Sequence, residues 1–492
     1  MPINETAFRN GFETQHQEVY EPSLTVQGNI PDWLVGTYVR NGPGQFDLGD
    51  DKRDPFGRYW HWFDGLAMPH RYKFENGTVG FANRYLRTET YKKDRETGKL
   101  NFRMSATDPK RSGWDKFLAT FGRMAFTDNT NIHTMELAGE YVALTERQEA
   151  YVFDLDTLET KGMFRYDKSA NNNTQTAHTH YDPATRIKYN LMLSFGLSSA
   201  YELYTLKDRR YTLLGRIPVR APSYMHSFSM TENYIVLTEY PLRISLLGTF
   251  QFLWTDTPYL DNFSWRPQDG TNIVIIDRKT GNIVKQVQAD ACFSFHHINA
   301  FEQGDSVIVD ISAYADGSVI QGLYVDTMKS DVEYSTMTAE FRRYTIDMQS
   351  YSALASVGYD LTTDDRIMLP RINYNHYNTK PYRYAYGLST AGNKRDFVNE
   401  IVKIDVDHAM TDKRWHVEGH YPSEPVFAPR PNATAEDDGL VMSTVYNSET
   451  DKSYLLLLDG QTFNVQATAD LLIRIPFGFH GRWYPNGNMY AL

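Results

Sequence analysis

Ile273-Val274-Ile275-Ile276-Asp277-Arg278-Lys279-Thr280-Gly281 is the most informative stretch of this chain. An apolar, β-branched run ends at an aspartate, and a threonine and a glycine follow it. Val and Ile favour strands. An aspartate in a turn accepts hydrogen bonds from the nearby backbone, and glycine adopts a positive φ without strain. The stretch therefore predicts a β-hairpin whose turn begins at Asp277.

The same order of an apolar strand, an aspartate and a turn returns at Tyr151–Thr157, Ile401–Asp405 and Leu455–Gly460. Hairpins spread evenly along a long chain favour small sheets repeated around an axis, which is a β-propeller. A large β-sandwich is the alternative, and no WD or kelch signature is present. No linker rich in Pro, Gly or Ser divides the chain. We therefore expect an all-β fold in one domain over residues 1–492.

The composition excludes several classes of protein. The chain carries 50 Lys and Arg against 61 Asp and Glu, and this net charge of −11 argues against a nucleic-acid partner held by phosphate contacts. Cys292 is the only cysteine, which excludes an internal disulfide and a metal site built on several thiolates. No apolar run approaches the roughly 20 residues of a transmembrane helix. No secretory signal is visible at the N-terminus.

Aromatic residues make up 14% of the chain, which suits both strands and apolar ligand tunnels. Two further segments, Trp114–Phe121 and Ile244–Trp254, are predicted to be helical with one apolar face. They are either core or cap elements, or an exposed patch that rests on a membrane or guards a lipophilic entrance.

Four of the 14 histidines lie in β-rich contexts where a metal site could form: His178, His226, His296 and His480. Their wide spacing excludes a helix-borne pair of the His-Glu-x-x-His kind. The inner strands of different propeller blades meet at the axis, so a propeller could bring these residues together. Each histidine taken singly is more often an ordinary residue, and the spacing alone does not establish a metal site.

Longer motifs add to this interpretation. They are Gly36-Thr37-Tyr38-Val39-Arg40-Asn41-Gly42-Pro43-Gly44, His61-Trp62-Phe63-Asp64-Gly65-Leu66-Ala67-Met68, the four histidine segments, Glu424-Pro425-Val426-Phe427 and Pro476-Phe477-Gly478-Phe479-His480-Gly481. In this order, and over essentially the whole chain, the sequence resembles the carotenoid cleavage oxygenase family, which also contains the retinal-pigment-epithelium isomerase. The resemblance implies a seven-bladed β-propeller with a cap of helices and loops over the iron-bearing axis.

The resemblance also implies one Fe(II) per chain, held by His178, His226, His296 and His480, with O₂ as co-substrate. His180 and His297 are close alternatives in sequence, but the family motif favours His178 and His296. Imidazole suits iron, and four neutral donors leave up to two octahedral positions open. Zinc prefers a closed tetrahedron in structural sites. An all-histidine set does not itself exclude zinc or copper, so the assignment of iron depends on the family.

In the family, three glutamates accept hydrogen bonds from ligand histidines and so fix their orientation. Glu146 matches the first and is paired here with His226, and Glu424 matches another and is paired with His480. The remaining glutamate is expected directly before Leu369, where this chain has Met368. We therefore expect His296 to bond to water, a carbonyl or another side chain, and the iron to be held less tightly.

The activity implied by the resemblance is oxidative cleavage of one C=C bond of a carotenoid or apocarotenoid, which gives two carbonyl products. The first alternative is cleavage of stilbene-type phenols, but members of that branch carry a lysine where this chain has Thr145. The second is isomerohydrolysis of retinyl esters, which is confined to a narrow vertebrate branch. The third is a propeller that binds lipids or partners without catalysis, which the absence of bound iron would indicate.

A lipophilic polyene dissolves in bilayers, so the enzyme is expected to be cytoplasmic with peripheral membrane contact. No nucleic acid or obligate protein partner is expected. Arg40 and Asp64 are expected to be structural, and Tyr224, Phe295 and Phe479 either line a tunnel or pack in the core. The candidate membrane patch consists of Leu246, Leu247, Phe250, Phe252, Leu253 and Trp254.

Overall fold

The hairpin predicted from residues 273–281 is confirmed. Strand β21 (Thr271–Asp277) pairs antiparallel with β22 (Ile283–Ala289). Asp277 accepts hydrogen bonds from the backbone N–H groups of Lys279 and Thr280, at 3.0 and 2.7 Å. Gly281 takes a φ of 71°, the left-handed conformation that a glycine adopts at little cost.

The other three hairpins are confirmed as well. They are β10 (Ala150–Phe153) with β11 (Thr160–Met163), β28 (Glu400–Asp405) with β29 (Met410–His416), and β33 (Lys452–Asp459) with β34 (Val465–Asp470). Asp154 and Asp459 each accept the N–H and hydroxyl of the threonine three residues later. The repeated turn thus reverses the chain at the outer edge of a sheet through hydrogen bonds between residues close in sequence.

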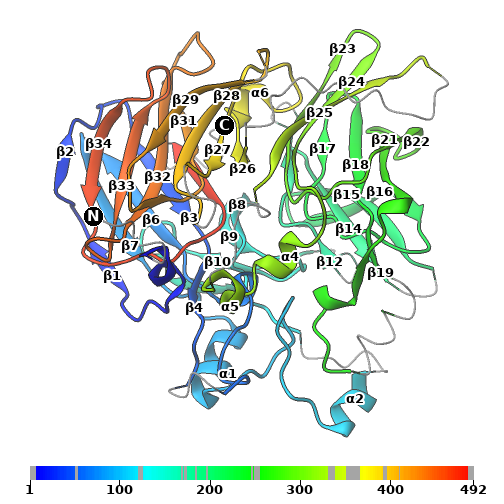
Figure 1. Cartoon of the computed structure of the whole chain (residues 1–492), viewed down its shortest axis with the longest axis horizontal. Helices are drawn as coiled ribbons and strands as arrows, with labels where there is room; N and C mark the ends of the chain where they lie inside the picture. Colours follow the sequence, from blue (N-terminus) through cyan, green and yellow to red (C-terminus); the bar gives the residue numbers. More distant parts are fainter. Residues whose placement is uncertain are drawn as a thin grey trace.

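The structure is a computed structural model that describes residues 7–49, 54–119, 126–167, 170, 174–182, 185–195, 198–244, 248, 255–330, 338–350, 366–391, 396–408 and 410–485. Seven sheets of three to six strands surround one axis, so the expected seven-bladed β-propeller is confirmed (Figure 1). We number these sheets as blades 1 to 7 in chain order, starting from the sheet that contains β3 (Gly36–Arg40).

The blades have the following strands in spatial order. Blade 1 is β1 (Val19–Glu21), β7 (Thr78–Asn83), β6 (His70–Glu75), β3 and β35 (Gly481–Pro485); blade 2 is β11, β10, β9 (Glu140–Leu144) and β8 (His133–Leu137). Blade 3 is β12 (Thr174–Gln175), β14 (Lys188–Ser194), β15 (Ala200–Lys207) and β16 (Arg210–Pro218), with β13 (His180–Tyr181) beside β14; blade 4 is β17 (Ser229–Met230), β18 (Tyr234–Glu239), β21 and β22.

Blade 5 is β23 (His297–Gln303), β24 (Ser306–Ala313) and β25 (Glu340–Asp347); blade 6 is β26 (Met368–Arg371), β27 (Tyr384–Ser389), β28 and β29. Blade 7 is β2 (Val26–Gly28), β34, β33, β32 (Gly439–Asn447) and β30 (His420–Pro422), with β31 (Val426–Pro429) beside β32. Two ribbons lie outside the blades, β4 (Pro43–Gln45) with β5 (Leu66–Ala67), and β19 (Leu242–Ile244) with β20 (Phe263–Trp265).

Both ends of the chain close the ring. The last strand β35 pairs antiparallel with β3 from the N-terminal region, and β2 pairs with β34 near the C-terminus. Contacts between blades run from β17 through β23 to β26 and from β31 through β35 to β8, so these strands form much of the inner wall around the axis. Apolar side chains fill the space between blades, as where Tyr72 of blade 1 packs with Met442 and Leu455 of blade 7.

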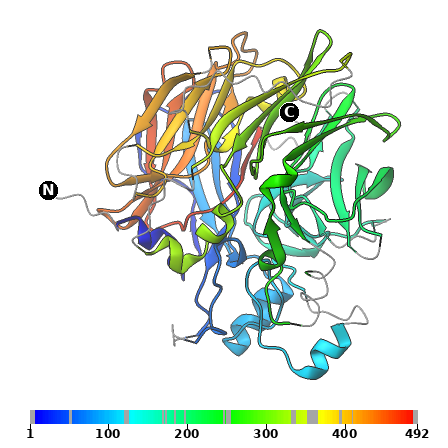
Figure 2. The ribbon, with the colours of Figure 1, turned by 45° about the vertical axis from the view of Figure 1, so that its right-hand side comes forward.

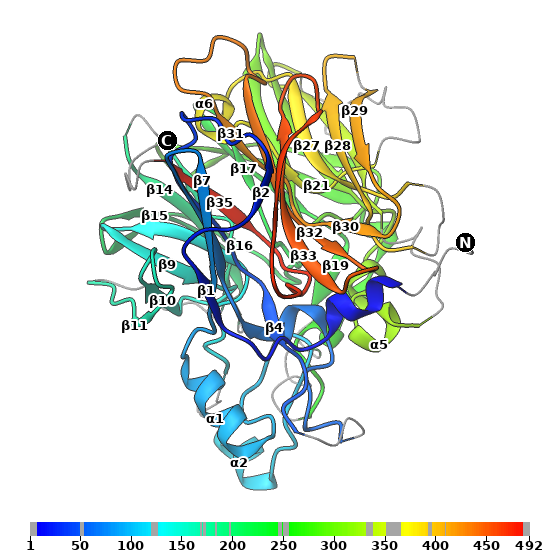
Figure 3. The ribbon, with the colours of Figure 1, turned by 90° about the vertical axis from the view of Figure 1, so that its left-hand side faces the viewer.

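Short helices and loops gather at one end of the propeller. The helices at this end are α1 (Glu89–Thr97), α2 (Gly113–Ala119), α4 (Val319–Gly322) and α5 (Val325–Met328), whereas α6 (Tyr374–Tyr377) lies at the opposite end (Figure 1). The 3₁₀ turns are η1 (Ala7–Phe12), η2 (Trp62–Asp64), η3 (Leu260–Asn262) and η4 (Pro267–Asp269). Helices α1 and α2 project from this end, as Figures 2 and 3 show from two further directions. In the part of the chain that the structure describes, no helix is long and apolar enough to cross a membrane.

The two predicted helical segments have different outcomes. Helix α2 covers most of Trp114–Phe121, although residues 120 and 121 lie outside the described residues. In the second segment, Ile244 ends strand β19. The candidate membrane patch formed by Leu246, Leu247, Phe250, Phe252, Leu253 and Trp254 lies outside the described residues.

Replacing Gly281 by Ala tests the packing of this hairpin on blade 3. A Cβ there would come closer than 3.0 Å to the Leu214 backbone oxygen. We expect the left-handed backbone to cost about 1–2 kcal/mol and the clash about 1–3 kcal/mol more. Chemical denaturation measures the sum. Gly304→Ala is the control, because its φ is also positive and nothing lies within 4 Å. Equal losses in the two variants would contradict the predicted clash.

Candidate metal centre

Four histidines from four blades meet at the propeller axis. His296 and His480 directly precede the inner strands β23 and β35, while His226 and His178 stand shortly before β17 and β13. One candidate ligand atom from each lies within 4.8 Å of the other three. Among the described residues, these four histidines form the group that is placed to hold a metal ion. Residues up to 302 positions apart in sequence thus share one site because each stands just before a strand of a different blade.

The spacing of the ring nitrogens fits a bound cation. The Nε2 atoms of His178 and His226 are 3.0 Å apart, and those of His296 and His480 are 3.3 Å apart. Two nitrogens at right angles around a metal, each about 2.1 Å from it, would be separated by about 3.0 Å. The donor set is therefore compatible with a divalent metal in a coordination sphere that is left partly open.

Two carboxylates orient two of the imidazoles. Glu146, which follows β9 of blade 2, lies with its Oε1 atom 2.5 Å from Nδ1 of His226 and also accepts the hydroxyl of Tyr224 at 2.9 Å. Glu424 of blade 7 lies with its Oε1 atom 2.7 Å from Nδ1 of His480 and accepts the N–H of Gly481 at 2.7 Å. Because Nδ1 then carries the proton, the Nε2 lone pairs of His226 and His480 face the centre.

Among the residues that the structure describes, His296 has no such partner. Its buried Nδ1 atom makes no hydrogen bond to any described residue, so the carbonyl or side chain that we anticipated is not found among them. Met368, at the start of β26 in blade 6, is buried and belongs with His296 to the wall of one cavity. A thioether accepts hydrogen bonds only weakly, so Met368 cannot replace a carboxylate in this role.

The neighbouring histidines face other groups. His180 lies 2.8 Å from the Tyr374 hydroxyl and 2.7 Å from the Phe228 carbonyl oxygen. His297 lies 2.8 Å from the Ser229 hydroxyl. The structure therefore leaves both outside the group formed by His178, His226, His296 and His480.

Hydroxyl and guanidinium groups that the sequence reasoning did not single out for the site hold its loops in place. Thr176 receives the N–H of His178 and donates to the carbonyl of His226, which joins blades 3 and 4. Arg40, fully buried, donates to the carbonyl oxygens of Glu424 and Phe479 at 2.9 and 2.8 Å. The expected structural role of Arg40 is thus to fix both ends of the Glu424–His480 pair. A hydroxyl residue two positions before a candidate ligand histidine is the sequence signal for Thr176.

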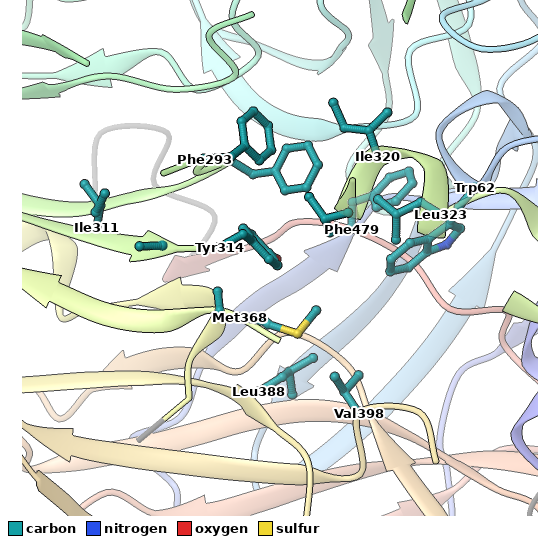
Figure 4. Packing of buried hydrophobic residues seen from close by; sticks show 14 of the residues in the cluster. Trp62, Phe293, Ile311, Tyr314, Ile320, Leu323, Met368, Leu388, Val398 and Phe479 are labelled. Carbon is teal, nitrogen blue, oxygen red and sulfur yellow. The ribbon is translucent and has the colours of Figure 1, made fainter. Parts of the chain in front are cut away.

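Two cavities of opposite character adjoin the histidines. The first, here called the apolar cavity, has a volume of about 60 Å³ and is lined with His226, His296 and His480 by aromatic and aliphatic side chains, among them Phe63, Phe295, Leu323, Met368, Leu388 and Phe479. Figure 4 shows Met368, Leu388 and Val398 facing Tyr314, Leu323 and Phe479. Phe295 and Phe479 therefore line a cavity, whereas Tyr224 is hydrogen-bonded to Glu146.

The second cavity, here called the axial chamber, has a volume of about 110 Å³. It adjoins His178, His296 and His480, and its wall includes His133, Arg371, Asn373, Tyr374 and Arg482. The histidine group is thus the partition between an apolar space and a polar one.

Comparison with known proteins identifies this architecture. A family model described as RPE65, retinal pigment epithelial membrane protein, matches residues 12–485. The chain belongs to this family, the carotenoid cleavage oxygenases. It is 30% identical to "Carotenoid-cleaving dioxygenase, mitochondrial" of Mustela putorius furo over 93% of both chains. It is 34% identical to "Carotenoid cleavage dioxygenase 8, chloroplastic" of Arabidopsis thaliana over 95% of this chain and 84% of that one.

A solved structure agrees with this assignment. The cobalt-substituted apocarotenoid oxygenase of Synechocystis superposes with a TM-score of 0.84 at 25% identity and covers 98% of this chain and 99% of that one. That relative holds a transition metal. In this carotenoid cleavage oxygenase, the four converging histidines are the described residues suited to hold one.

The environment keeps the imidazoles of His178 and His296 neutral. Burial, together with the neighbouring His480, holds the pKa of His178 and of His296 well below the ordinary value. Burial opposes ionisation of Glu424, but Arg371 and His480 overcome it and hold its pKa below the ordinary value. Neutral imidazoles with carboxylates behind them are the form that binds a metal.

Replacing Glu424 by Ala tests this arrangement. The buried N–H groups of His480 and Gly481 lose their acceptor, at about 1–3 kcal/mol each, and metal affinity falls about 10–100-fold. Anaerobic calorimetric titration with Fe(II) and thermal denaturation measure the two effects. Glu436→Ala is the control, because Glu436 accepts the backbone N–H groups of Arg383 and Tyr384 away from the histidines. Unchanged metal affinity in Glu424→Ala would contradict the assigned role.

Proposed function

We propose that this chain is an Fe(II)-dependent dioxygenase that cleaves one C=C bond of a carotenoid or apocarotenoid with O₂ and releases two carbonyl products. The observation that carries the proposal is a group of four converging histidines, His178, His226, His296 and His480, that faces an aromatic-lined apolar cavity. The names of the relatives, a carotenoid-cleaving dioxygenase and a carotenoid cleavage dioxygenase, support the substrate class.

The side chains of the cavity bind and orient the substrate. A polyene offers no polar group along its length, so its position depends on the length and shape of the apolar wall. Phe63, Phe295 and Phe479 pack at the histidines and exclude water from the reacting double bond. Fe(II), when bound, supplies the redox chemistry by which O₂ reacts with the polyene. The protein holds the iron with open positions and selects one double bond.

The test is single-turnover chemistry under ¹⁸O₂. Protein reconstituted anaerobically with Fe(II) is mixed with β-carotene, a long apocarotenal or resveratrol, and the products are weighed by mass spectrometry. We expect a polyene to give two carbonyl products that each carry one ¹⁸O atom, and the product masses identify the bond. Stoichiometric iron without any cleaved polyene would contradict the proposal.

The two alternative functions, stilbene cleavage and binding without catalysis, are separated by different measurements. Stilbene cleavage finds no support in the quoted relatives, whose names refer to carotenoids, and resveratrol serves above as its direct test. A binding propeller without catalysis would hold no stoichiometric metal, so the iron content of the purified protein separates it from the proposed enzyme.

Met368→Glu tests how His296 is held. A carboxylate at this position would accept the free Nδ1–H of His296. We expect iron retention during dialysis to rise about 10–100-fold. We also expect the KM for an apocarotenal to rise, because the same side chain lines the apolar cavity and a charge there is poorly solvated. Met368→Leu is the control, which keeps the wall apolar. Iron retention equal in both variants would contradict the role assigned to this position.

We further propose that the protein contacts membranes peripherally, because its substrate class dissolves in bilayers. Among described residues, Trp114 and Phe117 on α2 are 65% and 45% exposed and stack at 5.4 Å, at the projecting end of the molecule. Exposed aromatic side chains of this kind insert into the interfacial region of a bilayer.

Flotation with phosphatidylcholine liposomes tests the contact. We expect replacement of Trp114 and Phe117 by Ser to reduce the floated fraction several-fold. Leu472→Ser is the matched control, since Leu472 is also 65% exposed but follows strand β34 of blade 7. An unchanged floated fraction in the double variant would assign membrane contact to another surface.

A further inference from the structure

The axial chamber carries an excess of positive charge. Arg371 and Arg482 both belong to its wall. Arg371 donates to the Gly481 carbonyl at 2.8 Å and lies 4.0 Å from Glu424. None of the described carboxylates lies within ion-pair distance of the Arg482 guanidinium. Glu424, the carboxylate in the chamber wall, is already occupied by His480 and the Gly481 N–H.

A fifth imidazole stands in the same wall. His133, the first residue of β8, is only 8% exposed, and its ring centroid lies 5.6 Å from that of His480 and 6.1 Å from that of His178. Its Nδ1 atom is buried and makes no hydrogen bond to any described residue. A buried polar atom without a partner costs free energy. His133 therefore adds a buried imidazole to the chamber wall whose Nδ1 atom has no partner among the described residues.

A divalent metal bound by the four histidines adds to the excess of positive charge beside the axial chamber. Four neutral imidazoles leave a divalent metal with its full charge. Glu146 and Glu424 are the described carboxylates that approach these histidines, and Arg371 and Arg482 offset them in charge. Met368 provides no third carboxylate beside His296. The charge of the bound metal is thus left uncompensated within the described site.

We propose that the axial chamber binds one small carboxylate-type anion, such as formate or bicarbonate, between Arg482, Arg371 and His133. Guanidinium groups match the planar geometry of such an anion and bind it through paired hydrogen bonds. A chamber of about 110 Å³ accommodates an anion of this size together with water. The anion site lies on the opposite side of the histidines from the apolar cavity, so the polyene and the anion do not compete.

The anion and the metal should stabilise each other. An anion beside a divalent cation in a partly buried site gains electrostatic energy. Linkage requires that the metal raise anion affinity by the same factor by which the anion raises metal affinity. This inference goes beyond the proposed function, since it needs neither the polyene nor O₂.

Calorimetric titration with sodium formate tests the site in metal-free and Co(II)-loaded protein. We expect formate to bind both forms, and at least tenfold more tightly when Co(II) is present. Arg482→Gln and His133→Phe should each weaken formate binding at least tenfold in both forms. Arg430→Gln is the control, since Arg430 pairs with Asp438 after β31 and should leave formate affinity unchanged.

Two results would overturn the proposal. One is formate affinity unchanged in both Arg482→Gln and His133→Phe. The other is formate binding that requires Co(II) and is insensitive to both variants, which means that the anion coordinates the metal directly. Circular dichroism confirms folding, and if one variant fails to fold the other decides. The titration contains no polyene, so a failure of this test does not bear on the proposed function. The ¹⁸O₂ experiment tests the proposed function independently.

Discussion

The antiparallel pairing of β35 with β3 is the constraint on which the site depends. It attaches the last strand of the chain to the first blade and so closes the ring. Closure places His480 beside His178, His226 and His296, which arrive from three other blades. None of these residues is near another in sequence, so no local interaction could gather them. The metal centre is therefore a property of the closed ring, and its ligand spacing follows from how the inner strands pack.

The polar groups around the axis give two of the four histidines one defined orientation. Glu146 and Glu424 orient two rings, and Arg40 fixes the backbone on both sides of the second pair. Among the described residues no carboxylate pairs with His178 or His296, and Met368 belongs to the apolar wall. The site thus combines a firmly oriented half with a looser one. The histidines also lie between an apolar cavity and a polar chamber, so groups of opposite character face the candidate metal centre from two sides.

Much of the fold follows from local chemistry that is visible in the sequence. The aspartate turns at Asp154, Asp277 and Asp459 predict hairpins because their hydrogen bonds are made within four residues. The number of blades and the convergence of the histidines depend on contacts between distant strands, and family resemblance supplied them. The Nδ1 atoms of His133 and His296, which have no partner among the described residues, could not be predicted, since a missing partner is visible only when the neighbours are in place.

X-ray absorption spectroscopy of the Fe(II)-reconstituted protein tests the central claim most directly. The account predicts one iron per chain whose first shell contains only nitrogen and oxygen, with outer-shell scattering from four imidazoles. It also predicts an effect of His296→Ala, because this variant lacks one of the four rings. The number of imidazoles around the iron should fall by one, or iron binding should be lost. A spectrum with fewer imidazoles in the unaltered protein, with sulfur ligation from Met368, or unchanged in His296→Ala would contradict it.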